Sequence, residues 1–103
     1  MNYAKIGLVS EAYSKDEYGI DEVTESVKEV FARVDSISAR EFFSAGQNNI
    51  KPDFKMIVNA DEYGGEKIVT YSGQRYSVYR TYRSLENSLE LYVERKAGTQ
   101  GNE

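Results

Sequence analysis

The sequence predicts an all-β protein: a small antiparallel β-barrel or rolled sheet of five to six strands, with one short helix and a long loop. Segments in which apolar and polar residues alternate recur along the chain, and turn residues separate them. The strand-helix alternation typical of a parallel sheet is missing. At 103 residues the chain has room for one domain, which we assign to residues 1–98, with a disordered tail expected at 99–103.

The first predicted strand runs from Ile6 to Tyr13, where apolar and polar residues alternate. The polar stretch 14–19 interrupts it, and Gly19 suits a turn. The next segment, 23–35, is ambiguous. Its apolar residues fit one face of a helix, but β-branched residues also alternate within it as in a strand. We predict a strand and keep the helix as the alternative.

A short helix is predicted over residues 39–45. Ser38 and Glu41 have the spacing of a capping box, in which two side chains satisfy free N–H groups at the start of a helix. Gly46 can end the helix in a left-handed conformation. The stretch 46–53 then contains glycine, two asparagines and the single proline of the chain, so we expect an exposed loop that is the most flexible interior segment.

The second half of the chain has the stronger β pattern, and we expect two consecutive hairpins in it. A strand over 54–58 is predicted to pair with 67–71 through the turn residues 63–66. The dipeptide Ser72–Gly73 is predicted to join 67–71 to a longer strand at 74–83.

The last predicted strand covers residues 88–96 and has apolar residues on one face. Together with the preceding strand it is expected to supply much of the barrel core. The predicted core residues are Tyr76, Val78, Leu89, Leu91 and Val93.

Composition argues against most enzyme and metal chemistry. The chain has no cysteine, which removes disulfides and thiolates, and no histidine, which is the commonest general base and metal ligand. We therefore expect a protein that is not an enzyme and needs no cofactor or metal. The start of the chain lacks the features of a signal peptide, and no 18-residue apolar stretch is present, so we expect no membrane association and a cytosolic origin.

Acidic residues outnumber basic ones by 17 to 13, which gives a net charge of -4 and opposes tight nucleic-acid binding. The acids are concentrated between Glu11 and Glu29, where we expect a negative field. Four of them could gather around a hard cation, but regular ligand spacing is missing, and we interpret them as a solvated acidic loop. These four are Asp16, Glu17, Asp21 and Glu22.

An aromatic and basic cluster in the second half supports an alternative function, a small nucleic-acid-binding barrel of the oligonucleotide-binding kind. Stacking of bases on tyrosines and neutralisation of phosphates by arginines are the chemistry of such barrels. The simpler interpretation is that tyrosine is a favoured strand residue and that arginine packs over it across strands. The cluster consists of Tyr71, Arg75, Tyr76, Tyr79, Arg80, Tyr82 and Arg83.

Three stretches of the chain together resemble a known family. They are KIGL near the start, VFARVDSISAREFFSAGQNN in the middle and DEYGGEKIVTYSGQRYSVYRTYRSLENSLELYVERKAG at the end. Their order, spacing and total length, over residues 5–98, are similar to those of phage head-closure proteins of the head-tail joining family, particularly those of Gram-positive phages and prophages. The resemblance also favours a strand for 23–35.

The resemblance implies a small β-barrel that closes the portal channel after DNA packaging and offers a docking surface for the tail. It implies a homo-oligomeric ring, a dodecamer, between the portal-adaptor ring and the tail-completion proteins, with passing contact to packaged DNA. It also implies a location at the head-tail interface of the virion and in the host cytoplasm during assembly. The isolated chain is expected to be a monomer.

The same resemblance places the channel plug in residues 38–53. Phe42 and Phe43 are adjacent on the predicted helix and cannot both face one core, so one of them is a candidate contact to another subunit. The candidate plug and subunit-contact residues are Ser38, Arg40, Glu41, Phe42, Phe43, Gly46, Gln47, Asn48, Asn49 and Ile50.

Overall fold

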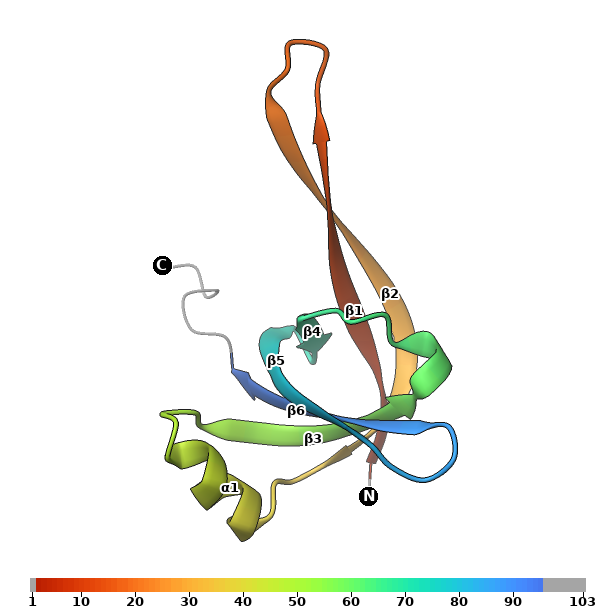
Figure 1. The fold of residues 1–103 in the computed structure, drawn as a ribbon. Helices are drawn as coiled ribbons and strands as arrows, with labels where there is room; N and C mark the ends of the chain where they lie inside the picture. The colour runs from red at the N-terminus through yellow and green to blue at the C-terminus, as the bar shows by residue number, and fades with distance from the viewer. Residues whose placement is uncertain (1, 96–103) are drawn as a thin grey trace.

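The computed structural model describes residues 2–95, which contain six antiparallel strands closed into a barrel and one α-helix (Figure 1). The strand order around the barrel is β1-β2-β3-β6-β5-β4. This confirms the predicted fold class, while the tail expected at 99–103 lies outside the described residues. The elements are β1 (Asn2–Lys15), β2 (Asp21–Asp35), α1 (Ala39–Gly46), β3 (Pro52–Asn59), the 3-10 helix η1 (Ala60–Glu62), β4 (Ile68–Tyr71), β5 (Gln74–Arg83) and β6 (Ser88–Arg95).

All six strands contribute to one apolar core. Alternation along each strand places every second residue inside the barrel, so short apolar runs from six strands fill it. Of the five predicted core residues, Tyr76, Leu91 and Val93 are buried, and Val78 and Leu89 pack against them partly buried. The remaining buried members are Ile6, Leu8, Val30, Ala32, Val34, Met56, Val58 and Val69.

Residues 23–35 form a strand, which settles the ambiguity left by the sequence. The valines with helical spacing are divided between the two faces of β2: Val30 and Val34 are buried, whereas Val23 and Val27 are exposed. β2 pairs with β1 along its whole length. The segment therefore follows the strand pattern of its β-branched residues and not their helical spacing.

One predicted hairpin is wrong and the other is confirmed. β3 pairs with β2 and β6 rather than with β4. After β3 the chain crosses the barrel through η1 and residues 63–67 and reaches β4, which lies between β1 and β5. A local turn signal cannot distinguish a tight hairpin from this longer crossing. The hairpin between β4 and β5 forms as predicted, with left-handed φ angles of 55° at Ser72 and 79° at Gly73.

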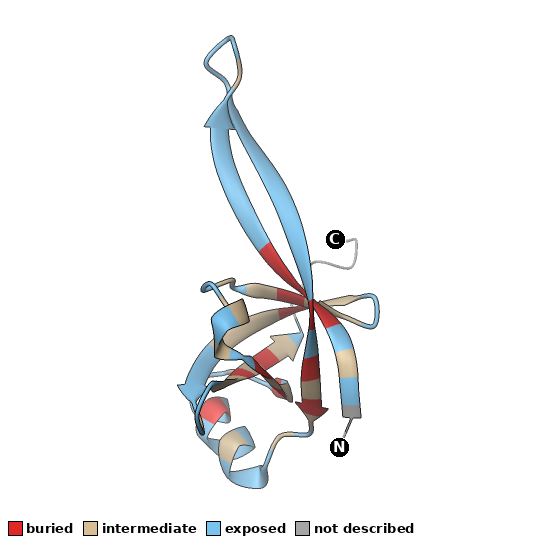
Figure 2. Ribbon diagram, turned by 90° about the vertical axis from the view of Figure 1, so that its right-hand side faces the viewer, coloured by how far each residue is buried: buried red, intermediate tan, exposed pale blue. Residues whose placement is uncertain are grey.

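β1 and β2 extend well beyond the barrel as a two-stranded ribbon, which we call the arm (residues 10–29) (Figures 1 and 2). β4 pairs with β1 only at residues 7–9, and β3 pairs with β2 only at residues 33–35. Every arm residue except Asp16 is exposed. At 3.3–3.4 Å per residue, the six residues of β1 in the arm reach roughly 20 Å from the barrel.

The tip of the arm is a short turn organised by Asp16. Its carboxylate accepts hydrogen bonds from the backbone N–H groups of Tyr18 at 2.8 Å and Ile20 at 2.9 Å. Gly19 has a left-handed φ of 79°, which glycine adopts without steric cost because it has no Cβ. The predicted acidic loop is therefore shorter than expected, because Asp21 and Glu22 already belong to β2.

Candidate functional site

Helix α1 lies at the end of the barrel opposite the arm (Figures 1 and 2). Its start was predicted well: the Ser38 hydroxyl accepts a hydrogen bond from the Glu41 N–H at 3.2 Å. In a complete capping box the Glu41 side chain would also accept a hydrogen bond from the Ser38 N–H. Here the Glu41 carboxylate binds side chains of β5 instead. Ala45 is the one buried residue of the helix, so the helix is attached to the barrel mainly through Glu41.

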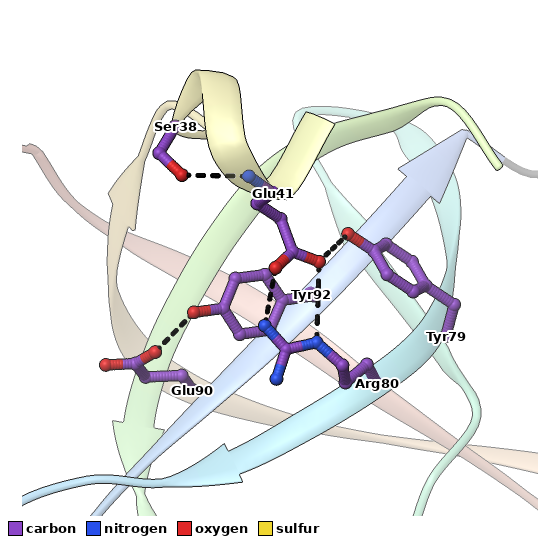
Figure 3. Close-up of polar contacts among 6 residues, drawn as sticks. All are labelled: Ser38, Glu41, Tyr79, Arg80, Glu90 and Tyr92. Atoms are coloured by element: carbon purple, nitrogen blue, oxygen red, sulfur yellow. Dashed lines mark hydrogen bonds and ion pairs between the residues drawn. The ribbon is translucent and has the colours of Figure 1, made fainter. Parts of the chain in front are cut away.

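Glu41 is the centre of a polar cluster that ties α1 to the barrel wall (Figure 3). The Tyr79 hydroxyl donates to Glu41 Oε2 at 2.7 Å, and Arg80 Nη2 donates to Glu41 Oε1 at 2.6 Å. The Arg80 guanidinium lies 4.0 Å from the centre of the Tyr92 ring. The Tyr92 hydroxyl in turn donates to Glu90 Oε1 at 2.6 Å. The Glu41 side chain is only 14% exposed, which makes this pair stronger than an ordinary surface salt bridge.

The environment shifts the pKa values of these groups. Burial alone would raise the pKa of Glu41, but the hydrogen bonds from Arg80 and Tyr79 and the Arg80 charge outweigh it and hold that pKa below its usual value. Burial and the nearby Glu41 carboxylate raise the pKa of Tyr79. Burial and the hydrogen bond to Glu90 raise the pKa of Tyr92 to about 12.

Replacing Glu41 by glutamine is expected to lower the free energy of unfolding by about 1 kcal/mol near neutral pH, because the charged pair with the partly exposed Arg80 is lost. The folded pKa of Glu41 lies below its unfolded value of 4.5. The contribution of the Glu41 carboxylate to the free energy of unfolding is therefore complete above its unfolded pKa. That contribution disappears as the pH falls through its folded pKa.

Urea unfolding of both proteins at a series of pH values checks this. The difference between wild type and Glu41→Gln should shrink in the acid range. A difference that is constant with pH would contradict the role given to the carboxylate. Ser44→Ala, on the exposed part of the same helix, is the matched control and should change little at any pH.

The predicted plug residues divide into two groups. Ser38 and Glu41 are hydrogen-bonded and hold the helix in place. The others are exposed except for the half-buried Ile50. The Phe42 and Phe43 rings lie edge to face with centroids 6.2 Å apart, and both are exposed. The exposed group also includes Arg40, Gly46, Gln47, Asn48 and Asn49.

The loop after the helix is shorter and better defined than expected. Gly46 does not have the predicted left-handed conformation; Asn49 does, with a φ of 64°. The N–H groups of Asn48 and Ile50 both donate to the carbonyl of Ala45, at 2.9 and 3.1 Å, and these bonds close the turn. β3 then begins at Pro52, which is buried instead of exposed, because the strand pairs there with Glu94 of β6. A proline fits at this first position of the strand, beside a bulge.

The aromatic and basic cluster of the second half is split by the fold. Tyr71 and Tyr76 pack with Phe54 at 5.5 and 5.6 Å between ring centres, beside the barrel core. Arg75 is paired with Glu25 at 3.0 Å and Arg80 with Glu41. Tyr79 donates its hydroxyl to Glu41, and the last two members, Tyr82 and Arg83, are exposed.

Sequence reasoning missed the arm as a candidate contact surface. Register pairs Tyr13 with Val23 and Val9 with Val27, so these side chains lie on the face that points away from the core. Tyr13, Val23 and Val27 are all exposed large apolar residues. The prediction of strands at 6–13 and 23–35 was right, but both were expected to belong to the barrel, and nothing in the sequence indicated that they run past it.

No family model and no curated protein matches this chain.

Within residues 2–95, no three acidic side chains are close enough together to hold a metal ion, and this includes the four acids at the arm tip. No α-helix in the described part of the chain is long and apolar enough to cross a membrane. The exposed large apolar residues of the arm and of α1 make these two surfaces the candidates for contacts.

Proposed function

We propose that this chain is a non-catalytic phage or prophage head-tail connector protein. In this role it closes the portal channel after DNA packaging and provides a docking surface for the tail, assembled with copies of itself into a ring. One observation carries the proposal: a barrel with a complete core presents two exposed apolar surfaces at opposite ends, the arm and α1 (Figures 1 and 2). A connector needs contacts on two sides, and exposed apolar patches typically mark such contacts.

The attachment of α1 suits a plug that must later open. The helix buries one residue and is held by a single polar cluster around Glu41. Such contacts can be broken while the barrel core stays intact, so the segment can move without unfolding the domain. The sequence resemblance over residues 5–98 independently favours this role for residues 38–53.

The nucleic-acid-binding alternative is less well supported. Strong binding of that kind depends on free arginine and lysine side chains against phosphate, whereas Arg75 and Arg80 are occupied by carboxylates. A DNA-binding titration at several salt concentrations separates the two functions. Affinity that is substantial at low salt and falls steeply as salt rises would favour the alternative.

Deleting the gene from the phage or prophage genome that encodes it is expected to give heads that lose their DNA and fail to join tails. Electron microscopy of induced particles and DNA protection from nuclease measure this directly. Normal, infectious particles without the gene product would refute the proposed function.

Complementation then tests α1. Phe43→Ser should fail to restore tail joining although the protein folds, because Phe43 is 71% exposed and contributes little to the core. The control Ala39→Ser, exposed on the same helix, should restore it. Full restoration by Phe43→Ser would exclude Phe43 from the contact.

A further inference from the structure

The two faces of the arm differ in chemistry. The inner face, which continues from the core positions Ile6 and Leu8, carries small or polar residues with no large apolar side chain; it consists of Ser10, Ala12, Ser14, Glu22, Thr24, Ser26 and Lys28. The outer face carries the exposed apolar side chains of Tyr13, Val23 and Val27 among charged ones, most of which are acidic. The charged residues of this face are Glu11, Lys15, Asp21, Glu25 and Glu29. A ribbon of two strands is marginally stable in water by itself, and exposed apolar residues on one of its faces are adapted to packing against another surface.

The barrel body has a row of aromatic, aliphatic and charged side chains on its own outer wall. Strand register places Tyr3 beside Arg33, Arg33 beside Ile57, Ile57 beside Glu90 and Glu90 beside Tyr82, in one continuous row across five strands. Tyr3 and Tyr82 are exposed at its two ends. We call this row the body stripe.

Lysines border the body stripe. Lys5 pairs across the strands with the exposed Phe31, and its ammonium lies 5.8 Å from the centre of that ring. Lys55 is next to Ile57 on the same face of β3, two residues before it. Neither lysine forms an ion pair within residues 2–95; Asp35, which lies across the strands from Lys55, is paired with Arg33 instead. An open hollow of about 570 Å³ also lies at the stripe, lined in part by Tyr3, Arg33 and Ile57.

Charge decides which surface the arm can meet. Between Glu11 and Glu29 stand seven acidic residues against two lysines, which leaves ten acidic and eleven basic residues in the rest of the chain. Two arms side by side would bring like charges together, which costs free energy. An arm against the body stripe instead brings its acidic residues near the cations Arg33, Lys5 and Lys55. It also brings its exposed apolar residues near the exposed aromatic residues Tyr3, Phe31 and Tyr82.

We propose that the outer face of the arm docks on the body stripe of a second copy of this chain. The contact is heterologous, because each copy gives its arm to one neighbour and receives an arm from another, and such contacts close into rings when the rotation allows. This inference specifies the ring contact of the proposed function and to that extent rests on it.

Zero-length carbodiimide cross-linking of the purified chain tests the contact, because it joins carboxylates to lysines that touch. A mixture of unlabelled and ¹⁵N-labelled protein identifies links between copies by mass spectrometry. We expect links between copies from arm carboxylates to Lys5 or Lys55, with yields that fall as salt rises. Absence of such links at the highest soluble concentration and low salt, or links between one arm and another, would overturn the proposal.

Paired variants make the test specific for a heterologous contact. The arm variant Tyr13→Ser with Val23→Ser and the body variant Tyr3→Ser with Tyr82→Ser should each lose the links when alone. When the two variants are mixed, links should reappear, because each variant keeps one intact surface. These links should join only the intact arm of the variant with the altered body stripe to the intact body stripe of the variant with the altered arm. The matched control Ala12→Ser with Thr24→Ser, a cross-strand pair on the inner face, should cross-link like wild type. No recovery in the mixture of folded variants would overturn the arm-to-body contact.

The two proposals fail separately. Arm-to-body links together with normal particles after gene deletion would support this contact and refute the head-tail role. Unsealed heads after deletion, without arm-to-body links, would keep the head-tail role and overturn this contact.

Discussion

Replacing Leu91 by alanine is expected to lower the free energy of unfolding by about 2 to 5 kcal/mol, the usual range for a buried leucine. Leu91 is 0% exposed and lies on β6, which pairs with both β3 and β5. Its neighbours across the strands include Met56, which is also completely buried. The cavity left by the truncation cannot collapse easily, because a closed barrel constrains both neighbouring strands.

Denaturant unfolding followed by circular dichroism measures this effect. The matched control is Leu85→Ala, in the turn between β5 and β6, where the leucine is 83% exposed. That change is expected to cost less than about 0.5 kcal/mol. Equal losses in the two variants would show that the strand face was assigned incorrectly.

Replacing Gly7 by alanine is expected to cost about 1 to 3 kcal/mol, because the added methyl group overpacks a filled site. A Cβ at this position would overlap the Thr70 hydroxyl and lie 2.7 Å from Val27 Cγ1. Both neighbours are β-branched side chains with little rotameric freedom, so they cannot move aside cheaply. Gly7 is the first of the three β1 residues that pair with β4, and Val27 belongs to the arm, so the strain acts at the base of the arm.

Gly46→Ala is the matched control for this prediction. A Cβ at Gly46 would meet nothing within 4 Å, and its φ is not left-handed. This substitution should leave the unfolding midpoint unchanged or raise it slightly. Thermal unfolding of both variants compares them directly, and a Gly7→Ala protein as stable as wild type would mean that the strands separate there without cost.

The barrel was predictable from the sequence because its strands follow the simplest rule of β structure. Alternation in 88–95 identified Leu91 and Val93 as core residues, and both are completely buried. The β4–β5 turn followed from Ser72–Gly73, and the start of α1 from the Ser38 cap. In these places the local preference and the fold agree.

The strand pairing of β3 was not predictable from local signals. Its partner β6 is about 35 residues further along the chain, and nothing in the turn residues 63–66 specifies whether the chain folds back or crosses the barrel. Closure of the barrel decided this, because it requires β4 between β1 and β5.

The candidate site was predicted in part. The sequence identified α1 and its two exposed phenylalanines, but the Glu41 contact with Tyr79 and Arg80 joins residues nearly 40 positions apart and became visible only in the folded chain. The arm was missed for a different reason. Its two strands were predicted, but as barrel strands, and only the acids at 16–22 were interpreted as a loop. A strand can carry this many acids because both faces of a ribbon outside the barrel are open to water.

By itself, then, the sequence determined the class of fold, the core face of β6 and the positions of α1 and the β4–β5 turn, since each depends on residues close together in the chain. The tertiary structure alone decided how far β1 and β2 run past the barrel, which strand β3 meets and what the Glu41 carboxylate binds. These depend on contacts between distant segments, whose free energy comes from closing one barrel around one core.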